Sequence, residues 1–139
     1  MADSVQILTA KLHRYCELFD TGQFDEFAAQ FADGQWHRAE PGKDATRAWI
    51  DEWVLTYDGR PGTQHLTTNL IVEVDEEAGT ATASSYITVI QGVEGFPMQP
   101  IFGGRYKDRF ERRGGEWVWL ERNVLSDVRG DTSHHVRSR

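Results

Sequence analysis

The spacing of apolar residues along the chain changes from one period to another near Thr63. Before this point apolar side chains recur in steps of three or four residues, which is typical of helices with one buried face. After it they recur at every second residue in segments rich in β-branched side chains, which is typical of strands. Because the helical part precedes the strand part, we expect an α+β domain with helices on one face of a sheet.

The first part of the chain predicts three helices, over residues 5–19, 24–31 and 43–55, with a short strand at 35–39. The apolar face of the first helix comprises Ile7, Leu8, Leu12, Tyr15, Cys16 and Phe19. The second part predicts strands that cover residues 66–74, 80–90, 101–112 and 117–125. Gly114-Gly115 is a strong hairpin signal, and the short turns indicate a curved antiparallel meander.

Length and composition indicate one globular domain. The 139 residues contain 39% hydrophobic and 27% charged side chains, without an internal repeat or a linker. We expect residues 1–128 to form the domain and residues 129–139 to form a polar, loose tail. Cys16 is the one cysteine, so the chain has no internal disulfide, and we interpret Cys16 as a small buried hydrophobe.

Charge and hydropathy exclude some partners. The chain has 22 acidic and 15 basic residues, and its formal charge of -7 repels phosphate backbones, so we expect no nucleic-acid partner. No apolar run approaches the ~20 residues that span a bilayer, so we expect no membrane partner. The first four residues lack the layout of a signal peptide, and a cytoplasmic location is therefore expected.

Two polar residues are candidates for chemistry. Asp20 follows the apolar face of the first helix, where the helix dipole disfavours a carboxylate, and His65 opens the first long strand. Each has an ordinary explanation, Asp20 as a turn residue and His65 as a half-buried histidine with a hydrogen-bond partner. If they meet, the carboxylate orients the imidazole, which is the usual construction of a general base near neutral pH.

Four segments carry a resemblance to a known family. They are Tyr15 to Asp20 followed by 24–31, His65 to Leu70, Gly103 to Phe110, and the strand from Trp117 to Glu121-Arg122. The chain resembles the SnoaL-like branch of the nuclear transport factor 2-like superfamily, which includes scytalone dehydratase, hexachlorocyclohexane dehydrochlorinase and bile-acid dehydratase. The resemblance implies a cone-shaped barrel, in which a curved, mostly antiparallel sheet wraps around three N-terminal helices.

The resemblance also implies an activity. Enzymes of this branch eliminate a small molecule from an apolar substrate through an Asp–His dyad, which corresponds to Asp20 and His65, and a pocket tyrosine corresponds to Tyr15. The expected substrate-binding residues are Tyr15, Phe19, Trp36, Trp49, Trp53, Asn69, Tyr86 and Tyr106. Scytalone dehydratase has a second histidine on a neighbouring strand, whereas residues 84–88 here offer only hydroxyl groups as polar side chains.

We therefore expect a cofactor-free lyase or isomerase for a small, apolar, cyclic substrate. In this hypothesis His65 removes a proton from carbon, Asp20 holds the imidazole tautomer, and Tyr15 or Tyr86 donates a hydrogen bond to the reacting oxygen or leaving group. A polyketide cyclase is a variant of the same hypothesis. The alternative is a binding or accessory module, similar to the small subunits of ring-hydroxylating dioxygenases, in which the dyad is a buried polar pair.

The remaining expectations concern metals and self-association. The five histidines, His13, His37, His65, His134 and His135, lack the spacing of a zinc site, so we expect no metal and no other cofactor. Strict alternation places His65 and Asn69 on one face of the first strand and an apolar stripe of Leu66, Leu70, Val72 and Val74 on the other. A partner sheet that covers this stripe predicts a two-fold homodimer.

Overall fold

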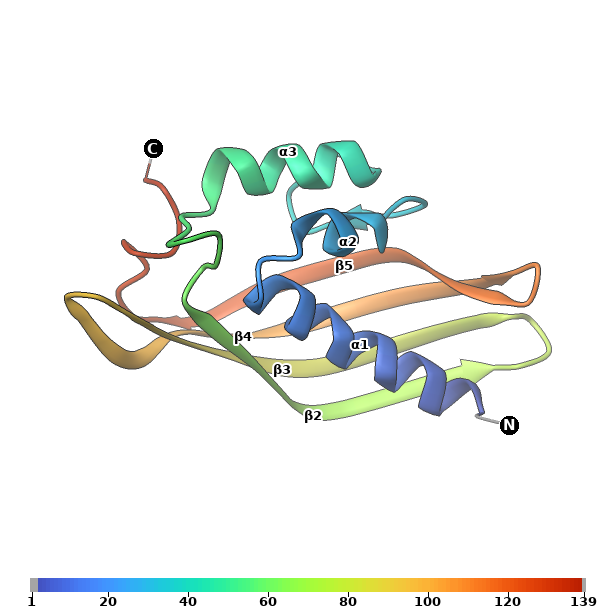
Figure 1. The fold of residues 1–139 in the computed structure, drawn as a ribbon. Helices are drawn as coiled ribbons and strands as arrows, with labels where there is room; N and C mark the ends of the chain where they lie inside the picture. The colour runs from blue at the N-terminus through green and yellow to red at the C-terminus, as the bar shows by residue number, and fades with distance from the viewer. Residues whose placement is uncertain (1–2, 139) are drawn as a thin grey trace.

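The computed structural model describes residues 3–138 and has the expected order of elements. Its helices and strands are α1 (Ser4–Asp20), α2 (Phe24–Ala29), β1 (Gln35–Trp36), α3 (Lys43–Trp53), β2 (Thr63–Asp75), β3 (Thr80–Val93), β4 (Phe96–Arg113) and β5 (Glu116–Arg129). The helices lie together on one face of the sheet (Figure 1), which we call the inner face. The predicted α+β class is confirmed.

The strands form one sheet in the order β1-β5-β4-β3-β2. Sequential strands from β2 to β5 pair antiparallel, and the short β1 adds to β5 in parallel. Within the described residues the sheet stays open, because β1 and β2 at its two edges do not pair with each other. No helix in residues 3–138 is long and apolar enough to span a membrane.

Helix α1 positions the site. Asp3 caps it, since its side chain accepts a hydrogen bond from the backbone N–H of Gln6 at 2.8 Å, and the Gln6 side chain accepts one from Asp3 in return. The predicted apolar face of the helix is buried against the sheet, above all against β2, except for Ile7, which is exposed. The chain leaves the helix through Gly22, whose φ of 76° and close approach to the carbonyl oxygen of Gly59 exclude a side chain.

A β-bulge in β2 reverses the predicted faces of that strand. Thr68 pairs with Tyr86 but Ile71 pairs with Ser84, so β2 has one residue more than β3 in this interval. Asn69 accommodates the extra residue in the left-handed conformation, with a φ of 53°. The bulge shifts the alternation by one residue from that point onward.

The face predicted for Leu70, Val72 and Val74 is therefore wrong. These three side chains pack against the core on the inner face, whereas Ile71, predicted to lie inward with His65, is exposed. Leu66, which precedes the bulge, is exposed as expected. The strict alternation failed because it assumed a strand without an inserted residue.

The expected loose tail is also wrong for the described residues. Residues 130–138, which we call the C-terminal segment, return beside the end of α3 (Figure 1). The backbone N–H of Leu55 donates to the carbonyl of His135 at 2.9 Å, and that of Arg137 donates to the carbonyl of Trp53 at 2.8 Å. The last residue of the predicted tail, Arg139, lies outside the described residues.

The bulge yields a stability prediction. Asn69→Val should destabilise the protein by about 1–2 kcal/mol, because a β-branched side chain is poorly tolerated in the left-handed region. Asn69→Gly is the matched control and should stay within a few tenths of a kcal/mol of the original chain. Urea unfolding of the three proteins measures the difference, and equal stability of the valine and glycine variants would contradict the left-handed bulge.

Candidate active site

Asp20 and His65 meet at the end of α1, as predicted. The Nδ1 atom of His65 lies 2.6 Å from Oδ1 of Asp20. The same carboxylate accepts the Thr63 hydroxyl at 2.8 Å on Oδ1 and the backbone N–H of His65 at 2.8 Å on Oδ2. Both side chains are largely buried, with 8% of His65 and 14% of Asp20 exposed.

The sequence of β2 explains this geometry. Thr63 and His65 are two residues apart on one strand, so their side chains share the inner face, where the end of α1 delivers Asp20. Because the carboxylate occupies Nδ1, the ring nitrogen left for chemistry is Nε2, which has no hydrogen-bond partner among residues 3–138. A carboxylate-bound imidazole with a free Nε2 is suited to accept a proton.

His65 lines a cavity of about 620 Å³ between the helices, the sheet and the C-terminal segment. The aromatic residues of its wall are Tyr15, Phe19, Trp36, Trp49, Trp53, Phe102 and Tyr106. The volume lies within the range of small-molecule sites, and the wall combines these aromatic side chains with polar and charged ones. The cavity therefore matches a ring-shaped ligand in size and surface.

Six of the eight expected substrate-binding residues line this cavity, and Asn69 and Tyr86 do not. Asn69 is exposed at the bulge, where its backbone adopts the left-handed conformation. Tyr86 is 52% exposed on the outer face, because its neighbours Ser85 and Ile87 occupy the inward positions of β3. Tyr86 is therefore no candidate hydrogen-bond donor in the cavity.

Two buried tyrosines supply neutral donors instead. The indole N–H of Trp36 donates to the Tyr15 hydroxyl at 2.9 Å, and the rings of Tyr15 and Tyr106 are in edge contact with centroids 5.7 Å apart. Burial raises the pKa of both phenols above the usual value, while the nearby Arg122 guanidinium works in the opposite direction. Both hydroxyl groups are thus protonated near neutral pH, and because the two phenols hydrogen-bond to each other, one proton of the pair is left to donate to a ligand.

Arg122 lies beneath these tyrosines in the core. Its guanidinium binds Asp108 through two hydrogen bonds of 2.7 and 2.9 Å, and both side chains are fully buried. The guanidinium carbon lies 3.6 Å from the centroid of the Tyr106 ring and 4.3 Å from that of Tyr15. Arg122 thus faces inward, where it supports both phenols.

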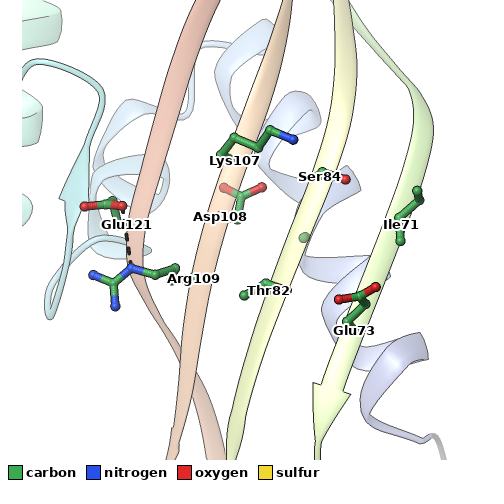
Figure 2. Close-up of a pocket in the computed structure, with 9 residues that line it drawn as sticks. Ile71, Glu73, Thr82, Ser84, Lys107, Asp108, Arg109 and Glu121 are labelled. Carbon is green, nitrogen blue, oxygen red and sulfur yellow. Dashed lines mark ion pairs between the residues drawn. The ribbon is translucent and has the colours of Figure 1, made fainter.

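A second hollow, of about 390 Å³, lies on the outer face and is not the candidate site. Figure 2 shows its side chains along β2 to β5, including the ion pair between Arg109 and Glu121 with an N–O distance of 3.6 Å. Its rim carries carboxylates and cations in alternation, and it contains neither histidine nor aromatic residue. Residues 3–138 also contain no group of three or more His, Cys, Asp or Glu side chains that could hold a metal ion.

Comparison with known families identifies the family of this chain. The family model described as a SnoaL-like domain matches residues 2–123, which is most of the chain. The chain belongs to the SnoaL-like family. The resemblance drawn from the four sequence segments is thereby confirmed, and no curated protein is a significant match to this SnoaL-like sequence.

Solved structures share the SnoaL-like fold. A protein of unknown function from Mycobacterium tuberculosis is 28% identical, with a TM-score of 0.71 over 86% of this chain and 69% of that chain. A protein provisionally named scytalone dehydratase, from Novosphingobium aromaticivorans, is 21% identical, with a TM-score of 0.69 over 89% and 84% of the two chains. ActVI-ORFA from Streptomyces coelicolor is 17% identical, with a TM-score of 0.68 over 86% and 92%.

His135 is a site residue that sequence reasoning missed. It lines the cavity of this SnoaL-like protein, with its ring centroid 6.5 Å from that of His65 and 6.0 Å from that of Phe19. Its Nδ1 atom is buried without a hydrogen-bond partner in residues 3–138. The polar composition of the C-terminal segment gave no sign of this role. The contacts that hold the segment beside α3 are backbone hydrogen bonds, which leave no pattern in the sequence.

His135 generates a pH prediction. Burial, with a smaller contribution from His65, lowers the pKa of His135 to about 4 from the usual 6.5. Between these values the unfolded chain binds a proton that the folded chain does not, so the free energy of unfolding falls as the pH falls from about 6.5 to about 4. His135→Gln should weaken this dependence by up to ~1.4 kcal/mol per pH unit, the value for one proton.

Urea unfolding of both proteins at a series of pH values measures the effect. His37→Gln is a parallel variant, because burial also lowers the pKa of His37 to about 4. An unchanged pH dependence in His135→Gln would contradict the buried, neutral state of His135.

Proposed function

We propose that this SnoaL-like protein is a cofactor-free lyase or isomerase that acts on a small apolar cyclic substrate. The observation that carries the proposal is the Asp20–His65 pair, which presents an imidazole to an aromatic cavity of about 620 Å³. His65 acts as the general base and Asp20 as the residue that orients and stabilises it. The dehydratase name of one structural neighbour is in keeping with this chemistry.

The mechanism begins with transfer of a proton from a substrate carbon to Nε2 of His65. The electron pair of that C–H bond forms a double bond to the adjacent carbon, and it either expels a leaving group from that carbon or delocalises onto a carbonyl oxygen. The Asp20 carboxylate stabilises the imidazolium that results. In an elimination the leaving group departs with its electron pair, and the imidazolium then releases its proton to the leaving group or to water. In an isomerisation the imidazolium returns its proton to another carbon.

Neutral groups in the cavity stabilise the negative charge that develops on the substrate. The hydrogen-bonded hydroxyls of Tyr15 and Tyr106, which together have one proton left to donate, take the role first assigned to Tyr15 or Tyr86. The uncharged ring of His135 is a third polar group beside His65. General base catalysis typically contributes ~10²–10⁴-fold, so the substrate has an acidified C–H bond or a good leaving group.

Two alternatives remain distinct from this proposal. A polyketide cyclase uses the same base to form a carbon–carbon bond, and the fold shared with ActVI-ORFA is compatible with it. A small-molecule-binding accessory subunit uses the same cavity without turnover, and the dyad is then a buried polar pair. Turnover of any substrate separates the enzyme from the accessory subunit.

Substitution of the dyad tests the enzyme proposal. With an active substrate from a panel of polyketide, steroid and halogenated ring compounds, Asp20→Asn and His65→Ala should each reduce kcat by about 10²–10⁴-fold. The melting temperature should change little, because neither side chain belongs to the apolar core. Turnover should also persist in a chelator, since no step uses a metal ion.

His13→Ala is the matched control, because His13 is exposed on α1 and lies outside the cavity wall. It should leave kcat unchanged. Full activity in Asp20→Asn or in His65→Ala would refute the dyad mechanism, and the accessory-subunit reading would replace it.

We also propose that the chain forms a homodimer through the outer face of its sheet. The apolar side chains exposed there are Leu66, Ile71, Tyr86, Leu125 and Val128. They replace the stripe expected from the sequence, of which only Leu66 faces outward. A partner sheet that covers them removes several large apolar side chains from water, at ~25 cal/mol per Å².

Light scattering tests this dimer. The original chain should have the mass of two chains at micromolar concentration. Ile71→Asp should shift the measured mass toward that of one chain, because burial of an unpaired carboxylate in an apolar interface costs free energy. Ile7→Asp is the matched control, since Ile7 on α1 is 45% exposed and Ile71 is 59% exposed. A mass of one chain for the original protein would contradict the proposal.

A further inference from the structure

Three arginines from separate parts of the chain line the cavity. Arg38 follows β1, Arg129 ends β5, and Arg137 belongs to the C-terminal segment. Each residue is exposed overall, so these cations lie on the solvent side of the cavity rather than in its aromatic interior. The mechanism proposed above uses none of them.

These arginines differ from most others in the chain because they have no carboxylate partner among residues 3–138. The arginines with a carboxylate oxygen within 4.0 Å are Arg14, Arg47, Arg105, Arg109, Arg112, Arg113 and Arg122. The described arginines without an ion pair are Arg38, Arg60, Arg129 and Arg137, and of these only Arg60 lies outside the cavity wall. Although the chain has 22 acidic residues, three of its four described arginines without an ion pair therefore line the same cavity.

The local charge of the cavity opposes that of the whole protein. Glu52 is the one carboxylate side chain in the described cavity wall, against three guanidinium groups, while the chain has a formal charge of -7. Charges farther away than the Debye length of ~8 Å are largely screened at physiological salt, so the nearby arginines dominate the potential that a ligand meets. An anionic group is thus favoured at this rim although the protein as a whole repels anions.

We propose that the ligand of this cavity is an amphiphile with an apolar ring system and an anionic oxygen group. The ring packs against the aromatic wall near His65, and the anionic group binds at the rim formed by Arg38, Arg129 and Arg137. Guanidinium groups bind carboxylate and phosphate oxygens through paired hydrogen bonds, so either anion satisfies the rim. This inference rests on the proposed function in taking the cavity as the substrate site, and it narrows the substrate class.

Titration calorimetry with three matched probes tests the inference without any need for turnover. The probes are 2-naphthoate, 2-naphthyl phosphate and the uncharged 2-naphthamide. At low salt at least one anion should bind about tenfold more tightly than the amide. Each exposed charge pair contributes only a few-fold in affinity, and the rim offers more than one such pair. The anion that binds more tightly identifies the group, and added salt should reduce the preference.

Two sets of variants locate the effect. The double variant Arg129→Gln with Arg137→Gln should lose most of the preference for anions and keep the affinity for naphthamide. Arg60→Gln, which removes an unpaired arginine outside the cavity, should bind all three probes as the original chain does. Asp20→Asn should retain the anion preference, so a failure of the dyad mechanism is separable from a failure of this inference.

Equal affinity for the amide and both anions would overturn the proposal. A preference for anions that survives in the double arginine variant would overturn it as well, and so would the absence of binding by both anions at millimolar concentration.

Discussion

The carboxylate of Asp20 is the contact on which the site depends. The dipole of α1 disfavours a negative charge at this helix end, and the three hydrogen bonds from Thr63 and His65 compensate for that cost. These hydrogen bonds join the end of the helix to the first residues of β2, and the same contacts hold the His65 ring in one orientation. One carboxylate therefore both ties the end of α1 to β2 and orients the imidazole at the cavity.

Polar groups in the core extend this arrangement. The buried pair of Asp108 and Arg122 places a cation against the rings of Tyr15 and Tyr106, whose pKa values burial raises, so the interior offers neutral hydroxyl groups beside the His65 base. Removal of one member of such a pair leaves an uncompensated buried charge, which is strongly destabilising. The unpaired arginines lie outside this interior, where a charged part of a ligand keeps access to water.

Much of the fold was predictable, because the change from helical spacing to alternation is local and long enough to be unambiguous. The pairing of Asp20 with His65 needed the family resemblance in addition, since no local pattern reports a contact between residues 45 positions apart. The errors have physical causes: the Asn69 bulge reversed the faces of β2, and backbone hydrogen bonds folded the C-terminal segment against α3. The inward direction of Arg122 goes with its hydrogen bond to the buried Asp108 on the neighbouring strand.

The state of the His65 ring tests the central claim most directly. Nitrogen NMR of histidine-labelled protein distinguishes the two neutral tautomers of each ring. Near neutral pH the neutral ring of His65 should carry its proton on Nδ1, donated to Asp20, and leave Nε2 unprotonated toward the cavity; Asp20→Asn should change this distribution. A neutral His65 with its proton on Nε2 in the original chain would contradict the account, because the nitrogen facing the substrate could not then accept a proton.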